Sequence, residues 1–333
     1  MMCIVKTEGE KMGSGSLIRV RHRKKLWLVP IVAALVCATA ALVVLGSYQS
    51  RSAQAQTTSA VVVGAGDIAS CTSKGDTATA RLLANIPGTV LAIGDNADRE
   101  GSLAQFRNCY RPTWGRFKAR TQPVVGNHEY RTNGAAGYFN YFGAKAGPVG
   151  KGYYSYNRGA WHIIALNSEC KYWATGFKDG PSRCSSRKQA NMIAWLKADL
   201  ANNPTACTLA YFHQPRFSSG QGGNAITATQ QIWEALYAAD ADVVLSGHDH
   251  IYERFAPQTP GGRLDTARGI REFVVGSGGV NHGRIGTIKA NSQVRNASAY
   301  GVLKLTLNPT SYSWNFVPEA GKSFKDSGTY SCH

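Results

Sequence analysis

Residues 89–95 read Thr-Val-Leu-Ala-Ile-Gly-Asp, an apolar run that ends directly in the pair Gly94-Asp95. A short apolar run bounded by a turn residue predicts a buried strand. The same arrangement occurs three more times: residues 60–63 precede Gly66-Asp67, residues 121–125 precede Gly126-Asn127-His128-Glu129, and residues 241–246 precede Gly247-His248-Asp249-His250. Because strand ends within one sheet can lie side by side, we expect these polar blocks to converge in the fold.

The polar blocks, together with the separate His213, supply carboxylate, amide and imidazole ligands. A carboxylate has two oxygens and can bridge two cations, imidazole suits zinc, and oxygen ligands suit harder ions such as iron, manganese or magnesium. Two cations roughly 3.5 to 4 Å apart lower the pKa of a bound water and hold the oxygens of a phosphate group. The residue types therefore predict a dinuclear metal site that hydrolyses phosphate esters.

The five blocks in this order resemble those of the calcineurin-like metallophosphoesterases. Within that superfamily the sequence is most similar to the purple acid phosphatase branch, because the last block continues as His250-Ile251-Tyr252-Glu253-Arg254. The resemblance implies an α/β fold with two mixed β-sheets packed face to face and flanked by helices, a metallophosphoesterase-like four-layer sandwich. It also implies a metal-dependent phosphatase that cleaves phosphate monoesters by in-line attack of a metal-bound hydroxide.

Carried over block by block, the resemblance gives each polar residue a role. The metals are expected to be two divalent or trivalent ions, namely iron, zinc or manganese. The expected ligands are Asp67 and His250 for the first ion, Asn127, His213 and His248 for the second, and Asp95 as the bridge between them. His128 would stay unligated and stabilise the developing charge or protonate the leaving oxygen. Glu129 would orient His128.

Two positions depart from the family pattern. The general family has a histidine two residues after the first aspartate, where this chain has Ala69. Purple phosphatases lack that histidine too, but they have a metal-bound tyrosine three residues after the bridging aspartate, where this chain has Asp98. Because a carboxylate is shorter than a phenol, either Asp98 reaches the first metal through a small loop shift, or that ion keeps three protein ligands plus water.

The N-terminal 55 residues have the layout of a targeting segment. Residues 19–25 are basic, residues 26–46 form an uncharged apolar stretch, and Ala53-Gln54-Ala55 offers a small-residue cleavage site. This pattern predicts a secretory signal peptide, and the length of the apolar stretch leaves an uncleaved membrane anchor as the alternative. Either reading places residues 56–333, the expected catalytic domain, outside the cytoplasm, with membrane contact only if residues 26–46 are retained.

Six of the eight cysteines lie in the expected exported part: Cys71, Cys109, Cys170, Cys184, Cys207 and Cys332. An even number of cysteines in an exported chain predicts disulfides, with buried free thiols as the alternative. A bond between Cys71 and Cys109 would join the segments after the first two strands, and one between Cys170 and Cys184 would close a short loop.

The charge of the chain bears on its partners. The formal net charge is +17, and because residues 1–55 hold eight Lys or Arg and two Glu, residues 56–333 carry +11. Such a surface attracts anionic substrates. The exported part has no basic run longer than Arg187-Lys188, so we expect a small phosphate ester as the substrate and no specific nucleic acid. The pattern specifies no oligomeric state.

Helix and strand signals alternate along residues 60–333. Asp76 is expected to cap a helix through Ile86, Ser185 or Ser186 a second helix through Leu200, and residues 227–239 have helical spacing. Two hairpins are expected, one joining residues 153–157 to 161–167 and one joining residues 301–307 to 311–317. Helices that alternate with strands, mixed with hairpins, favour two mixed sheets packed together.

Three other functions compete with the phosphomonoesterase. A phosphodiesterase or nuclease of the same fold would use the same ligands, and a metal-binding module without turnover would fit a weak first site at Ala69 and Asp98. Residues 61–69 also match a dinucleotide-binding pattern, Gly-x-Gly-x-x-Ala. That pattern needs a helix to begin at once and an acidic residue about 20 positions on, and the sequence has neither, so we reject it.

Overall fold

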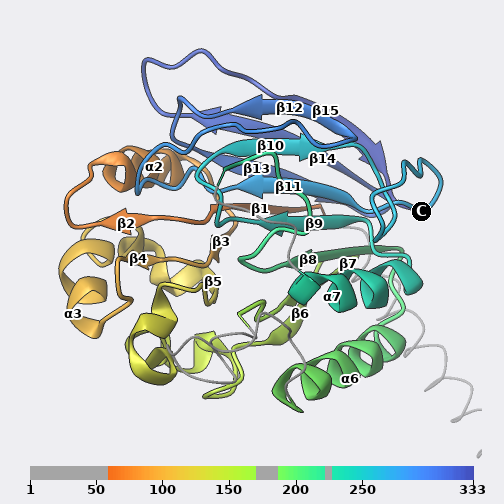
Figure 1. Ribbon diagram of the computed structural model, residues 1–333, viewed down its shortest axis with the longest axis horizontal. Helices are drawn as coiled ribbons and strands as arrows, with labels where there is room; N and C mark the ends of the chain where they lie inside the picture. The colour runs from red at the N-terminus through yellow and green to blue at the C-terminus, as the bar shows by residue number, and fades with distance from the viewer. Residues whose placement is uncertain (1–58, 170–186, 222–226) are drawn as a thin grey trace, which may run out of the picture. The chain divides into compact units, whose positions relative to one another are not determined.

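Two β-sheets and a short two-stranded ribbon form the framework of the computed structural model, which describes residues 59–169, 187–221 and 227–333 (Figure 1). In order across the first sheet lie β15 (Ser327–Ser331), β14 (Ser311–Pro318), β13 (Gly301–Asn308), β1 (Ala60–Ala65), β3 (Thr89–Ile93) and β5 (Thr121–Val124). Across the second lie β12 (Ser292–Asn296), β10 (Tyr252–Phe255), β11 (Arg271–Val275), β9 (Val243–Ser246), β8 (Cys207–Tyr211), β7 (Trp161–Ala165) and β6 (Tyr154–Arg158). The ribbon pairs β2 (Ala69–Ser70) with β4 (Ala97–Asp98).

The described helices are α2 (Gly75–Asn85), α3 (Leu103–Gln105), α4 (Ala136–Phe142), α6 (Arg187–Asn202) and α7 (Thr227–Ala238). Shorter turns of 3-10 helix span Trp114–Arg120, Glu129–Arg131, Asn133–Ala135 and Gly143–Ala146, and a π-helical turn spans Phe106–Tyr110. Helices α6 and α7 lie side by side, on the opposite side of the strands from α2 and α3 (Figure 1).

Aromatic side chains from the two sheets interlock between them. Tyr252 on β10 lies against Phe316 on β14 with ring centroids 4.4 Å apart. Trp161 on β7 packs against Tyr312, also on β14, with ring centroids 5.8 Å apart. One apolar cluster contains residues of both sheets, and strands β3, β7 and β8 are buried along their whole length. Both sheets mix parallel and antiparallel pairs, so the predicted face-to-face packing of two mixed sheets is confirmed.

Both predicted hairpins are present, as β6 with β7 and as β13 with β14. The predicted helices correspond to α2, α6 and α7, but the cap of the first was wrong. Helix α2 begins at Gly75, and Asp76 lies in its first turn, where its carboxylate accepts hydrogen bonds from the Thr77 amide and the Thr113 hydroxyl. Ser185 and Ser186, expected to cap α6, lie outside the described residues.

Among the described residues, two disulfides link distant segments. Cys71 bonds to Cys109, as predicted, and Cys207 at the start of β8 bonds to Cys332 beyond β15. Cys170 and Cys184 lie outside the described residues, as do the predicted signal or anchor and its cleavage site. Within the described ranges, none of the helices has both the length and the apolar character needed to span a bilayer.

Candidate metal centre

The predicted ligands follow strands whose ends point the same way. Strands β1, β3 and β5 are parallel neighbours, and they lead into Asp67, Asp95 and Asn127 respectively. Strands β8 and β9 are parallel neighbours in the second sheet and lead into His213 and into His248 with His250. Since carboxyl ends of parallel strands share one edge of a sheet, these blocks meet where the two sheets adjoin.

Backbone hydrogen bonds join the polar blocks to one another. The Asp67 amide donates to the Gly94 carbonyl at 3.1 Å, and the Gly247 amide donates to the His213 carbonyl at 2.9 Å. A bond across the sheets runs from the His248 amide to Asp67 Oδ2 at 2.7 Å. The loops therefore hold one another in place without help from a ligand.

The tight approach of the loops explains two of the glycines. A Cβ on Gly126 would lie 2.2 Å from Asp95 Oδ1, and one on Gly94, whose φ is +75°, would lie 2.6 Å from the His213 ring. Asp67, Asp95 and His248 themselves have positive φ angles of 57°, 47° and 69°. Residues other than glycine seldom adopt this backbone conformation, and those that do are concentrated at functional sites.

One group of donor atoms, which we call the inner cluster, comprises Asp95, Asn127, His213 and His248. His213 Nε2 lies 3.1 Å from Asp95 Oδ2 and 3.2 Å from Asn127 Oδ1, and His248 Nδ1 lies 3.0 Å from the same Asn127 oxygen. His213 Nδ1 donates to the Ile93 carbonyl at 3.0 Å, which leaves Nε2 of the neutral ring as an acceptor. Lone pairs that face one another in this way fit a bound cation.

A second group, the outer cluster, comprises Asp67 and His250. His250 Nε2 lies 3.3 Å from Asp67 Oδ1, and His250 Nδ1 is hydrogen-bonded to Asn281 Oδ1. Asp67 Oδ1 is fully buried and has no hydrogen-bond partner among the described residues. A buried carboxylate oxygen left without a hydrogen bond beside an imidazole nitrogen is a ready ligand for a metal.

The electrostatics of the site also favour a cation. Burial raises the pKa of Asp95, but His213 and then His128 lower it well below its usual range. Burial lowers the pKa of His213, but Asp95 and Asp67 raise it well above normal. The acidic groups therefore stabilise positive charge at this position. Burial and the neighbouring His213 lower the pKa of His248 to about 4, which keeps this imidazole neutral and able to bind metal.

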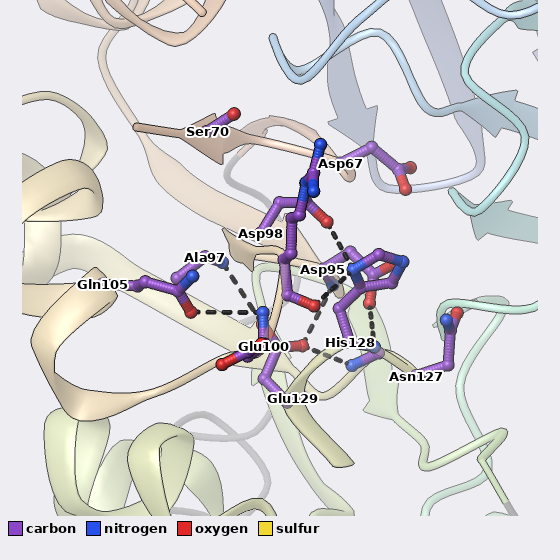
Figure 2. A network of polar contacts seen from close by, with 12 residues as sticks. Asp67, Ser70, Asp95, Ala97, Asp98, Glu100, Gln105, Asn127, His128 and Glu129 are labelled. Atoms are coloured by element: carbon purple, nitrogen blue, oxygen red, sulfur yellow. Dashed lines mark hydrogen bonds and ion pairs between the residues drawn. The ribbon is translucent and has the colours of Figure 1, made fainter. Parts of the chain in front are cut away.

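His128 and Asp98 form a pair beside the inner cluster. His128 Nδ1 contacts Asp98 Oδ1, while His128 Nε2 lies 3.8 Å from Asp95 Oδ2, so the ring stands between the two carboxylates (Figure 2). Burial lowers the pKa of His128, but Asp98 and Asp95 outweigh it and raise the pKa above its normal value. In this arrangement Asp98, considered at the sequence level as a metal ligand, holds the histidine that faces the shared aspartate.

Glu129 does not orient His128, contrary to the sequence-based expectation. Its carboxylate accepts four backbone hydrogen bonds, from the amides of Asp95 (3.0 Å), Asn96 (2.8 Å), Ala97 (3.2 Å) and Gly126 (2.7 Å). Figure 2 shows Glu129 beneath the loop that carries Asp95. Glu129 therefore fixes the backbone that presents Asp95 and Asn127, rather than a side chain.

Three residues of the site escaped the sequence analysis. Gln214 Nε2 lies 3.4 Å from Asn127 Oδ1 and 3.2 Å from Glu169 Oε2, so a buried amide and a buried acid support the asparagine from behind. Asn281, from a loop after β11, contacts His250. Gln214 was detectable because it adjoins His213, and Asn281 because it follows β11 and Gly278-Gly279, whereas Glu169 follows no strand-and-glycine pattern.

The comparisons with known proteins agree with this geometry. The profile of the calcineurin-like phosphoesterase family matches residues 61–252, more than half of the chain. The chain belongs to this family. Members of the calcineurin-like phosphoesterase family use a dinuclear metal centre, and the ligand types and burial found here fit such a centre.

Curated relatives include phosphatases from plants and fungi. Purple acid phosphatase 23 of Arabidopsis thaliana is 28% identical over 220 residues, which cover 55% of this chain and 45% of that protein. An acid phosphatase of Aspergillus ficuum is 25% identical over 224 residues, covering 53% of this chain and 36% of that enzyme. The match therefore spans less than half the length of these curated relatives.

Solved structures share the fold at low sequence identity. A purple acid phosphatase from yellow lupin seeds superposes with a TM-score of 0.59 at 18% identity, covering 83% of this chain and 54% of that one. The GAP50 protein of Plasmodium superposes with a TM-score of 0.64 at 16% identity, covering 83% of this chain and 89% of the other. These likenesses place the fold among the metallophosphoesterases.

Proposed function

We propose that this protein is a metal-dependent phosphatase that hydrolyses small phosphate monoesters. Several of its relatives are named acid phosphatases. The supporting observation is that the two sheets bring together the five chain segments that carry the inner and outer clusters. The His248 amide joins the two clusters through its hydrogen bond to Asp67 Oδ2 at 2.7 Å. Asp67 and His250 would hold one ion, Asn127, His213 and His248 the other, and Asp95 both.

Two bound cations would lower the pKa of a coordinated water and neutralise charge on the phosphate oxygens. The residues of the chain would position these ions and the substrate. Glu129 and the paired loops keep the ligand backbone in place, so the substrate enters a preformed site. His213, which is fully buried, and His248, which is partly buried, limit the access of bulk water to the inner cluster.

His128 is the group placed to handle the leaving oxygen. Its ring is 20% exposed, so a substrate can reach it, and its raised pKa keeps a proton on the ring at mildly acidic pH. Asp98 holds Nδ1 and thereby directs Nε2 toward Asp95 and the substrate position. We infer that His128 donates the Nε2 proton to the departing alkoxide and that Asp98 positions it.

The test compares an aryl phosphate with its bis-aryl diester on protein loaded with zinc, iron or manganese, with the metal content measured on the same samples. Faster hydrolysis of the monoester supports the proposal. Faster cleavage of the diester would replace it with a phosphodiesterase. One tightly bound ion without any turnover would leave the metal-binding module as the function.

We also propose that residues 56–333 act outside the cytoplasm. Disulfides between Cys71 and Cys109 and between Cys207 and Cys332 support this, because such bonds persist in oxidising compartments. N-terminal sequencing of the protein recovered from culture medium and from membranes tests it. A mature chain that begins at Gln56 in the medium indicates cleavage, whereas recovery of the full chain in membranes indicates an anchor.

A further inference from the structure

A second pocket adjoins the candidate metal centre, on the side of the histidine pair. It has a volume of about 130 Å3, and its walls include Gly220, Gln221, His248, His250, Gly283 and Arg284. Since a water molecule occupies about 30 Å3 in the liquid, the pocket has room for a group the size of phosphate. It opens directly beside two of the expected metal ligands, and the mechanism described above does not use it.

The rim of this pocket is built from two loops that are fixed to each other. The Gln221 amide donates to the Arg284 carbonyl at 3.0 Å, and the Gly286 amide donates to the Ser219 carbonyl at 2.7 Å. The Gly283 amide donates to the His250 carbonyl at 2.8 Å, which ties the same rim to the metal-binding segment. The backbone on either side of Arg284 therefore has a defined position relative to His250.

The exposed charge of the pocket is positive. The Arg284 guanidinium makes no ion pair or hydrogen bond with any residue in the described ranges, and the residue is exposed. The acidic residue of the wall, Asp249, is only 2% exposed, and its Oδ2 accepts a hydrogen bond from the Ser218 hydroxyl. An arginine fork binds phosphate through two parallel hydrogen bonds, so an anion in this pocket would find a ready partner.

We propose that Arg284 determines substrate specificity by binding a second phosphate group, carried by the leaving group of the substrate. The proposal rests on the proposed phosphatase function, because the first phosphate must lie at the metal centre for the second to reach this pocket. It selects substrates with two neighbouring phosphates, such as a condensed phosphate, over monoesters with an uncharged leaving group.

The experiment measures kcat and KM of the metal-loaded full chain for inorganic pyrophosphate and for an aryl phosphate, with free metal held constant by buffering. Arg284→Ala should lower kcat/KM for pyrophosphate by about ten- to a hundredfold, mainly through KM, and leave aryl phosphate hydrolysis unchanged. Arg284→Lys should restore part of the loss, because lysine keeps the charge but not the fork. Arg187→Ala, at the exposed start of α6, is the matched control and should behave as wild type.

The outcomes separate the subsite from the phosphatase itself. An equal loss for both substrates would place Arg284 on the transferred phosphate and overturn the proposal, as would no loss for either. Wild-type protein that hydrolyses neither substrate, with two metals bound, would overturn the proposed phosphatase function instead. Because Arg284 is exposed, its substitution leaves the core intact, and an unchanged unfolding curve verifies this.

Discussion

The inner and outer clusters, which we propose are bridged by Asp95, differ in how far the protein encloses them. In the inner cluster, His213 is fully buried and Asn127 is 8% exposed, and their donor atoms lie within 3.2 Å of each other. In the outer cluster, the His250 side chain is 25% exposed, and it contacts Asp67 and Asn281. The protein therefore encloses His213 and Asn127 of the inner cluster, whereas His250 of the outer cluster is partly exposed to solvent.

The difference extends to the residues that support each cluster. Glu272 accepts hydrogen bonds from the amides of Arg216 and Phe217, just after His213, and from Ser246, just before the loop that carries His248. Gln214 and Glu169 lie behind Asn127. His250, in contrast, is supported by a hydrogen bond to Asn281, which lies on an exposed loop. We infer that the inner site holds its ion tightly and that the outer site exchanges its ion more readily.

The largest effect is expected when Asp95, the aspartate proposed to bridge the two ions, is replaced. Asp95→Asn should abolish binding of both ions and lower turnover by more than about a thousandfold, because the bridging charge disappears. Elemental analysis and aryl phosphate hydrolysis check this. Asp240→Asn, an exposed aspartate paired with Arg268, is the control and should change neither quantity. If Asp95→Asn retained both ions, Asp95 would not be the bridging ligand, and the two clusters would bind their ions independently.

The next effect tests a residue outside both clusters. His128→Ala should keep two ions and slow turnover by roughly two to four orders of magnitude, since the proton donor is lost. Asp98→Asn should keep the metals too, with a loss of about ten- to a hundredfold through misplacement of the ring. Loss of the outer ion in Asp98→Asn would show instead that Asp98 is a ligand.

A direct comparison of the clusters uses one histidine from each. His213→Ala should weaken binding of the inner ion by more than about a hundredfold. This loss exceeds the one expected when a residue that only supports a metal ligand is removed. His250→Ala should leave one tightly bound ion per chain. Metal stoichiometry after dialysis against a graded series of chelators measures both. If His250→Ala lost its ions more readily than His213→Ala, the ranking of the two sites would be reversed.

The smallest effect concerns the pH dependence of the inner support. Burial raises the pKa of Glu272 to about 8 in the folded protein, so the folded state holds this proton more tightly than the unfolded chain. Its contribution to stability is therefore complete below about pH 4 and declines up to about pH 8. Relative to wild type, Glu272→Gln should gain unfolding free energy as the pH rises across that range, which urea denaturation of metal-free protein measures. A constant difference would contradict the raised pKa.

Local signals account for what the sequence predicted well. Strands β1, β3 and β9 were expected because an apolar run before glycine is a local pattern. Edge strands β12 and β15 were not expected, because their residues are mainly polar and partly exposed, so no hydrophobic alternation marks them.

The roles of the supporting residues needed the fold. Glu129 follows His128 in sequence, which suggested that it orients that ring, but three of its four partners are amides 32 to 34 residues earlier in the chain. Glu169 and Gln214 meet only because β7 and β8 are neighbours. Spacing reveals which residues end a strand, whereas tertiary pairing decides which of them touch.

The left-handed backbone at Asp67, Asp95 and His248 has an evolutionary consequence. Each such residue costs about 1–3 kcal/mol relative to a conformation that suits it, and glycine would relieve that cost. Selection for heat tolerance alone would therefore favour glycine at three positions that we propose bind metal. Under the proposed function, selection for catalysis opposes that change, so a descendant released from that selection should lose these three residues first.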